Sequence, residues 1–131
     1  MILHISIPAR DPRRVASVLA ELMQGQLYPF PGALKDAFMA VSGDVHGTQI
    51  EVYKDTVLLT RADNPSRVAY LNEEEPPANY PFHFALTVPI DEPAITRIAQ
   101  REGWALAGRT GQSRSSTVLC HGVMARKPSA G

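Results

Sequence analysis

The stretch that decides the fold is the N-terminal segment Ile2-Leu3-His4-Ile5-Ser6-Ile7-Pro8-Ala9-Arg10-Asp11-Pro12. Its short run of β-branched residues predicts a strand over 2–8 that stops at Pro8, since proline lacks the backbone N–H of a strand ladder. Asp11 is a preferred N-cap residue, and Pro12 fits the first helical position. The segment therefore predicts a strand followed directly by a helix.

The same order of features returns later in the chain, in Phe82-His83-Phe84-Ala85-Leu86-Thr87-Val88-Pro89-Ile90-Asp91-Glu92-Pro93. Each copy has an early histidine in an apolar strand, a proline at the exit, and an aspartate that caps a helix. The intervals from His4 to Pro8 and from His83 to Pro89 are both even, so each histidine shares a strand face with the proline that follows it. The repetition indicates an internal duplication.

The helices of the two copies match as well. Val15, Val18, Leu19 and Leu22 form an apolar stripe at helical spacing, and Ile95, Ile98 and Ala99 stand at the corresponding positions of the second copy. We predict helices over 12–24 and 92–102. The other predicted elements are strands over 26–30, 37–41, 48–53, 56–60, 82–88, 104–108 and 116–124.

These patterns predict an α+β fold of two pseudo-repeated βαβββ modules, which form a curved mixed sheet around a cleft. The first module is expected over 1–61 and the second, C-terminally short module over 82–131. Between them, 62–81 carries several prolines and an acidic triplet. This composition predicts a Pro-rich linker, partly extended.

Composition narrows the classes of function. The chain has 131 residues, 44% hydrophobic and 20% charged, with a formal net charge of zero. The balance disfavours a nucleic-acid partner, whose phosphates a protein neutralises with excess basic residues. No apolar run reaches the roughly 20 residues of a membrane span. A single cysteine and the lack of a signal-peptide pattern predict a cytoplasmic protein that does not bind membranes.

The side chains most suited to chemistry are His4, Glu51 and His83. If the halves are copies, their first strands place both histidines on the concave face of the sheet. Strict alternation over 48–53 places Gln49, Glu51 and Tyr53 on one face of the fourth strand. Two imidazoles and a carboxylate form a ligand set for Zn²⁺, Ni²⁺, Mn²⁺ or Fe²⁺. Taken alone, a strand histidine is more often structural, so the hypothesis rests on the conjunction of the three residues.

The paired modules, the His-x-x-x-Pro…Asp opening of the first and the Phe-His-Phe-Ala-Leu-Thr-Val-Pro opening of the second resemble the vicinal oxygen chelate superfamily. This superfamily includes glyoxalase I, bleomycin-resistance proteins, methylmalonyl-CoA epimerase and extradiol dioxygenases. The resemblance covers most of the chain. It implies a divalent metal held by His4, Glu51 and His83, lyase, isomerase or oxygenase-type chemistry, and a homodimer.

The sequence departs from the superfamily at the fourth metal ligand. Carrying Glu51 forward by the repeat offset leads to Ala130 or Gly131, and no carboxylate follows Glu102. In the isomerases of the superfamily the corresponding glutamate is implicated as the base that moves the substrate proton. Because this fourth ligand is missing, the divalent metal can be absent from the protein. Because the proton-transferring base is missing as well, we assign no catalytic residue.

Three alternatives stay open beside a metalloenzyme. The chain can be a metal-free protein that sequesters a small organic ligand, as the bleomycin-resistance proteins do, with pocket walls from Tyr28, Tyr53, Phe82 and Phe84. It can retain the fold of the superfamily with a broken ancestral site. Outside the superfamily, a ferredoxin-like interaction module without a pocket has a similar alternation of strands and helices, but it does not explain the paired histidines.

Overall fold

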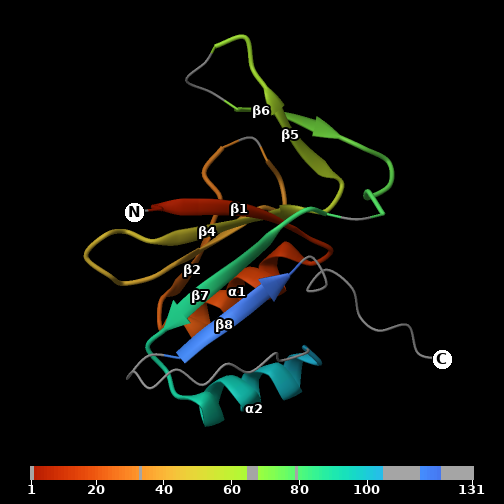
Figure 1. Cartoon of the computed structure of the whole chain (residues 1–131). Helices are drawn as coiled ribbons and strands as arrows, with labels where there is room; N and C mark the ends of the chain where they lie inside the picture. The colour runs from red at the N-terminus through yellow and green to blue at the C-terminus, as the bar shows by residue number, and fades with distance from the viewer. Residues whose placement is uncertain (1, 33, 65–67, 79, 105–115, 122–131) are drawn as a thin grey trace, which may run out of the picture.

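The computed structural model describes residues 2–32, 34–64, 68–78, 80–104 and, for the backbone, 116–121 (Figure 1). These residues form two α-helices and eight β-strands with α+β architecture. The elements, in chain order, are β1 (His4–Ala9), α1 (Pro12–Leu22), β2 (Gln26–Pro29), β3 (Phe38–Val41), β4 (Gln49–Lys54), β5 (Val57–Arg61), β6 (Val68–Asn72), β7 (His83–Val88), α2 (Glu92–Glu102) and β8 (Ser116–His121).

The first half of the chain folds as a βαβββ unit. Its four strands form a mixed sheet in the order β1-β4-β3-β2, in which β1 runs parallel to β4 and the other neighbours are antiparallel. The predicted start of α1 is confirmed, because the Asp11 side chain accepts a hydrogen bond from the backbone N–H of Arg14 at 3.0 Å. This cap turns the chain from β1 into the helix that crosses to β2.

Helix α1 covers one face of the four-stranded sheet. The row Ile5, Ile50, Ala40 and Leu27 runs across all four strands, and Ile7 and Val52 lie on the same face. These side chains pack with the apolar stripe of α1 in a single core cluster. Strand alternation then directs the neighbouring residues of each strand to the opposite face.

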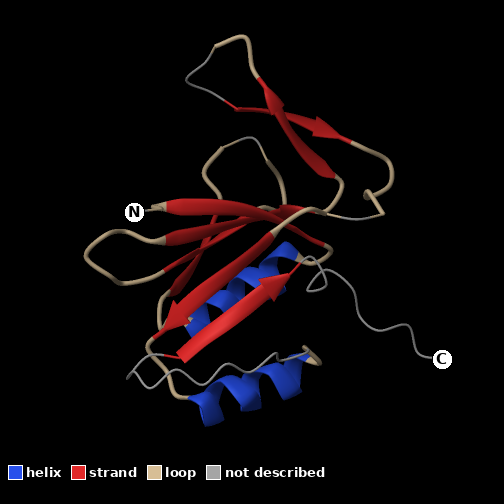
Figure 2. Ribbon diagram, in the orientation of Figure 1, coloured by secondary structure: helices blue, strands red, loops and turns tan. Residues whose placement is uncertain are grey.

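The second half joins the same core. Val88 of β7 and Ile95 and Ile98 of α2 are buried in the cluster that contains the α1 residues. Helix α2 has the predicted bounds, and the Asp91 side chain caps it by accepting from the backbone N–H of Ala94. Figure 2 shows β7 and β8 in front of α1, with α2 below them, and the two strands form a sheet separate from the four-stranded one.

The pseudo-repeated arrangement of two βαβββ modules is not confirmed by the described residues. Strand β8 pairs with β7 in the antiparallel direction, whereas the strand that pairs with β1 in the first half runs parallel to it. Strand β8 is therefore not the counterpart of β4. The strand predicted over 104–108 lies, beyond Trp104, outside the described residues.

Residues 62–81, predicted to be a linker, contribute a strand. Their segment Val68–Asn72 is β6, which pairs antiparallel with β5 to form a hairpin separate from both other sheets. The hairpin projects at the top of Figure 1, beyond β1 and β4. Neither helix in the described part of the chain is long and apolar enough to cross a membrane.

Candidate functional site

The face of the four-stranded sheet opposite α1 carries most of the predicted site residues. The register places Ser6 of β1, Glu51 of β4, Met39 of β3 and Tyr28 of β2 in one row across this face. His4 stands two residues before Ser6, and Tyr53 two residues after Glu51, so both lie on the same face. We refer to this surface as the open face of the sheet.

Glu51 is the centre of the open face. Only 9% of the residue is exposed, although it carries a carboxylate. Its Oε2 atom accepts a hydrogen bond from the Ser6 hydroxyl at 2.8 Å and another from the Tyr53 hydroxyl at 2.5 Å. A buried carboxylate needs such donors, because removing it from water is otherwise costly.

The second oxygen of Glu51 faces His4. The Oε1 atom lies 3.9 Å from Nε2 of His4, which is beyond hydrogen-bond distance. Within the described part of the chain no donor completes a hydrogen bond to Oε1. The His4 side chain is about half exposed, so this oxygen and the imidazole together form a polar site that solvent can reach.

Tyr53 connects Glu51 to an aromatic cluster. Its ring meets Phe30 edge to face at a centroid distance of 5.2 Å and Tyr70 of β6 at 5.8 Å. Burial, together with the hydrogen bond to Glu51, raises the pKa of the Tyr53 phenol well above its usual value. The phenol therefore stays protonated and donates its hydrogen to Glu51 at neutral pH.

The other predicted pocket residues lie elsewhere. Tyr28 belongs to the open face but sits in the edge strand β2, where it is exposed and its hydroxyl donates to the Gln26 side chain at 2.8 Å. Phe82 and Phe84 have ring centroids 6.4 Å apart, and both pack against the core cluster. Among the four aromatic residues predicted as pocket walls, Tyr53 is the one that contacts Glu51.

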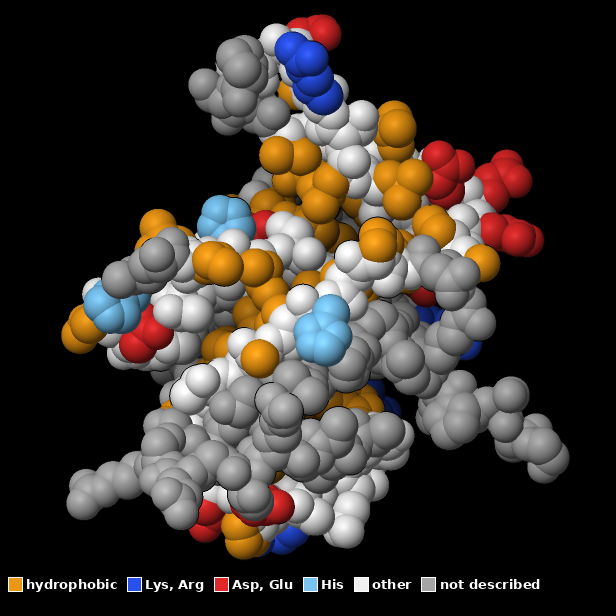
Figure 3. All heavy atoms as spheres, in the orientation of Figure 1, with side chains coloured by type: hydrophobic (Ala, Val, Ile, Leu, Met, Phe, Trp, Pro, Cys, Tyr) orange, Lys and Arg blue, Asp and Glu red, His pale blue; other side chains and the backbone are white. Residues whose placement is uncertain are grey.

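The structure brings together two of the three predicted metal ligands. His83 is exposed on β7, on the strand face opposite the one through which Phe84 reaches the core. Histidine side chains on the face shown in Figure 3 form separate patches. No group of three or more His, Cys, Asp or Glu side chains among the described residues could hold a metal ion. His4 and Glu51 alone provide fewer protein ligands than the three that a catalytic zinc site uses.

Three residues of the site were missed in the sequence. Ser6 could have been found, because it follows His4 by two positions and strand alternation puts both on one face. Phe30 and Tyr70 gave no such signal. Tyr70 reaches Tyr53 only because β6 pairs with β5, a pairing within a segment whose prolines suggested a linker.

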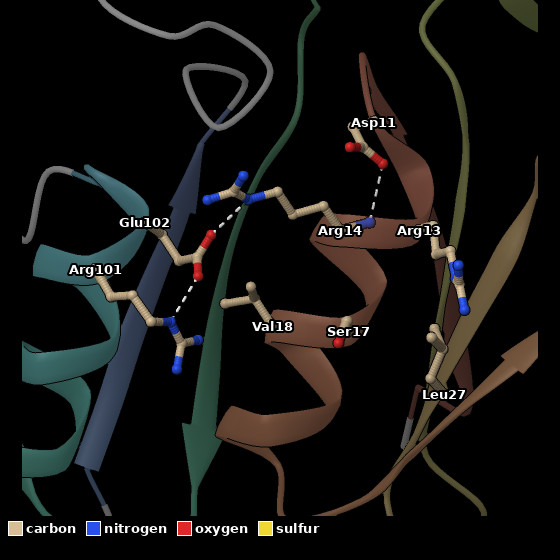
Figure 4. A pocket seen from close by; sticks show the side chains of 8 residues that line it. All are labelled: Asp11, Arg13, Arg14, Ser17, Val18, Leu27, Arg101 and Glu102. Atoms are coloured by element: carbon tan, nitrogen blue, oxygen red, sulfur yellow. Dashed lines mark hydrogen bonds and ion pairs between the residues drawn. The ribbon is translucent and has the colours of Figure 1, made fainter.

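A surface pocket of about 360 Å³ lies between α1, α2 and β2 (Figure 4). The carboxylate of Glu102, whose side chain is 6% exposed, accepts from Nε of Arg14 at 2.8 Å and from Nε of Arg101 at 2.7 Å. Arg101 also forms a bidentate pair with Glu21 of α1. These charges compensate one another, so we assign the pocket a structural role at the contact between the helices.

Comparison with known proteins adds no assignment to this architecture: no protein-family model, no curated protein and no solved structure matches the chain. The fold and site thus define an α+β protein with a mixed four-stranded sheet and a buried, hydrogen-bonded carboxylate on its open face. The resemblance to the vicinal oxygen chelate superfamily stays a prediction from the sequence.

Proposed function

We propose that the protein binds a small organic molecule on the open face of its four-stranded sheet, through a hydrogen-bond-donating group that meets Glu51 and His4. The observation that carries the proposal is the asymmetry of the Glu51 carboxylate. Its Oε2 atom already accepts two hydrogen bonds, from Ser6 and Tyr53, while Oε1 faces His4 and accepts no hydrogen bond from the residues that the structure describes.

This asymmetry favours a binding role for physical reasons. No side-chain oxygen or nitrogen among the described residues is buried without a partner, so Oε1 is not a buried orphan but faces the half-exposed His4, where a ligand can reach it. Ser6 and Tyr53 hold the Glu51 side chain in one rotamer, so a ligand does not have to order it. An imidazole nitrogen that carries no proton is an acceptor, and Nε2 of His4 lies beside Oε1. A donor group of a ligand can therefore meet two acceptors at once.

A thermal-shift screen of small organic molecules tests the proposal. We expect at least one compound to raise the melting temperature of the wild type, and the shift to shrink in Glu51→Gln and His4→Ala. His46→Ala is the matched control, since His46 is an exposed histidine in the loop between β3 and β4. If every stabilising compound acts equally on Glu51→Gln and the wild type, the open face is not the binding site.

A divalent metal is the second candidate, favoured by the 3.9 Å approach of His4 to Glu51. The described residues fit this candidate only in part, because they supply two donors, and we derive no chemical step through a metal. Metal analysis of protein purified without chelator tests it. Stoichiometric metal that is lost in both His4→Ala and Glu51→Gln would support the site, and a further loss in His83→Ala would support the predicted three-residue set. Wild-type protein without metal would contradict it.

A further inference from the structure

One face of the β5–β6 hairpin carries large apolar side chains and contacts the site around Glu51 through Tyr70. In the hairpin register Leu59 stands opposite Tyr70, and strand alternation puts both on the same face as Val57. The Tyr70 ring contacts the Tyr53 ring at 5.8 Å, and Tyr53 donates to Glu51. The face that carries Leu59 and Tyr70 is therefore continuous with the site through Tyr53.

This face remains accessible. Tyr70 is 36% exposed and Leu59 is 47% exposed, although both are large and apolar. Hydrophobic side chains gather over the hairpin in the upper part of Figure 3. A two-stranded hairpin needs an additional packing partner to be stable in water, and the contact between the Tyr70 and Tyr53 rings joins it to the sheet.

From this juxtaposition we infer that the ligand is an aryl or alkyl ammonium compound: Glu51 and His4 receive its ammonium group, and Tyr70 and Leu59 receive its apolar body. The inference rests on the proposed function and names the class of molecule that the site takes. An ammonium group matches the charge of the Glu51 carboxylate, which lies next to the His4 imidazole and the hydroxyls of Ser6 and Tyr53. An anion would meet the same carboxylate at unfavourable energy.

The aromatic cluster supports the same class of ligand. Tyrosine rings attract cations through their faces, and this attraction strengthens where water is excluded. Arg61 shares the Leu59 face of the hairpin, but it stands two residues nearer the tip and farther along the chain from Tyr53. Along the hairpin, Leu59 and Tyr70 therefore stand between Arg61 and the sheet whose strand β4 carries Glu51.

The hairpin itself provides a matched control. Leu71 pairs with Leu58 on the opposite face, and its exposed fraction of 50% is close to that of Leu59. Leu59→Ala and Leu71→Ala remove the same side chain from the same hairpin, and only the first removes it from the face continuous with Glu51. Both positions are exposed, so neither substitution threatens the fold.

The experiment uses dansylcadaverine, a fluorescent aryl compound with a primary ammonium group, and dansylamide, which lacks that group. We expect saturable binding of dansylcadaverine to the full chain, weakened about fivefold or more by Tyr70→Ala and by Leu59→Ala. Tyr70→Phe keeps the ring and should retain binding, as should Leu71→Ala. Dansylamide should bind about tenfold more weakly than dansylcadaverine.

The outcomes separate this inference from the proposed function. One result would be that Glu51→Gln weakens dansylcadaverine binding while Tyr70→Ala and Leu59→Ala bind as the wild type does. The hairpin subsite, formed by Tyr70 and Leu59, would then be wrong, and the site at Glu51 would be retained. Equal losses in Leu59→Ala and Leu71→Ala would also overturn the subsite. If Glu51→Gln binds the probe as tightly as the wild type, the proposed function itself fails at this site. Absence of saturable binding up to about 1 mM would overturn the ammonium class.

Discussion

The hydroxyl of Tyr53 lies 2.5 Å from Oε2 of Glu51, two residues earlier on the same strand. Side chains at this spacing share a strand face, so β4 supplies both the buried carboxylate and one of its donors. Ser6 on the parallel neighbour β1 supplies the other donor. The pairing of β1 with β4 therefore creates the polar centre of the open face, which neither strand could form alone.

Removal of the Tyr53 hydroxyl is expected to destabilise the protein. In Tyr53→Phe the buried Glu51 carboxylate loses one of its two donors, while the ring and its aromatic contacts remain. We expect the free energy of unfolding to fall by about 1–3 kcal/mol, because a hydrogen bond to a charged group is lost and a buried acceptor is left short of donors. Urea denaturation monitored by circular dichroism measures the change.

The double variant Glu51→Gln/Tyr53→Phe provides the control for this prediction. If the loss arises from the bond between the two residues, the effects of the single substitutions should not add. Additive effects, or a Tyr53→Phe protein as stable as the wild type, would contradict the assigned hydrogen bond.

Tyr53 also predicts a loss of stability at alkaline pH. Burial, and then the bond to Glu51, raises the pKa of the folded-state phenol far above the ordinary value of 10.0. As the pH rises above about 10, the unfolded chain releases the Tyr53 proton while the folded chain retains it, so the free energy of unfolding decreases. Urea titrations between about pH 9 and pH 11 measure how the free energy of unfolding falls with pH. This fall should be shallower in Tyr53→Phe than in the wild type.

Part of the loss of unfolding free energy at alkaline pH should remain in Tyr53→Phe. The pKa of Tyr80 is also raised, by burial and by the charge of Asp55. Tyr28→Phe is the control substitution, because the Tyr28 side chain is exposed on an edge strand. The prediction would be contradicted if the change of unfolding free energy with pH were the same in Tyr53→Phe as in the wild type. It would also be contradicted if Tyr28→Phe reduced this change equally.

The local elements could be predicted because their signals are local. Asp11 and Asp91 cap the helices as expected, and the bounds of α2 are as predicted. The alternation over 48–53 correctly placed Glu51 and Tyr53 on one face, and the approach of His4 to Glu51 follows from the parallel register of β1 and β4. Alternation determines which residues share a face within a strand.

The relation of the two halves depends on long-range packing that alternation does not determine. His83 has the same local context as His4, yet it lies on β7, which pairs antiparallel with β8 and packs with α1 and α2 through Val88. The β5–β6 hairpin was missed for a similar reason. Val68–Asn72 is short and flanked by prolines, and its strand character comes from pairing with β5.

The ion pairs between α1 and α2 predict a loss of stability in acid. Burial would raise the pKa of the Glu102 carboxyl, but hydrogen bonds from Arg101 and Arg14 lower it below its usual value of 4.5. The hydrogen bond from Arg101 is also the main cause that lowers the pKa of Glu21. This stabilisation is complete above about pH 4.5 and is lost as the pH falls through the lowered pKa values.

Arg101→Gln tests the ion pairs directly. We expect this variant to be less stable than the wild type at pH 7, with the difference shrinking at about pH 3 and at high salt, where the carboxylates are neutralised or screened. Arg97→Gln is the control, because Arg97 is exposed on the same helix and takes no part in these pairs. A variant difference that does not vary with pH would show that the pairs add no stability.

Gly25 is expected to tolerate no side chain. It precedes β2, and a Cβ atom at this position would lie 2.0 Å from the carbonyl oxygen of Val41 on the neighbouring strand. The obstacle is backbone, so relief requires β2 and β3 to separate near the pair formed by Gln26 and Val41. We expect Gly25→Ala to lower the free energy of unfolding by about 3 kcal/mol. Gly43→Ala, whose Cβ would meet nothing within 4 Å, should change it by less than about 0.5 kcal/mol. Urea denaturation of both variants measures the contrast, and equal stability of the two would mean that β2 does not approach β3 as closely as described.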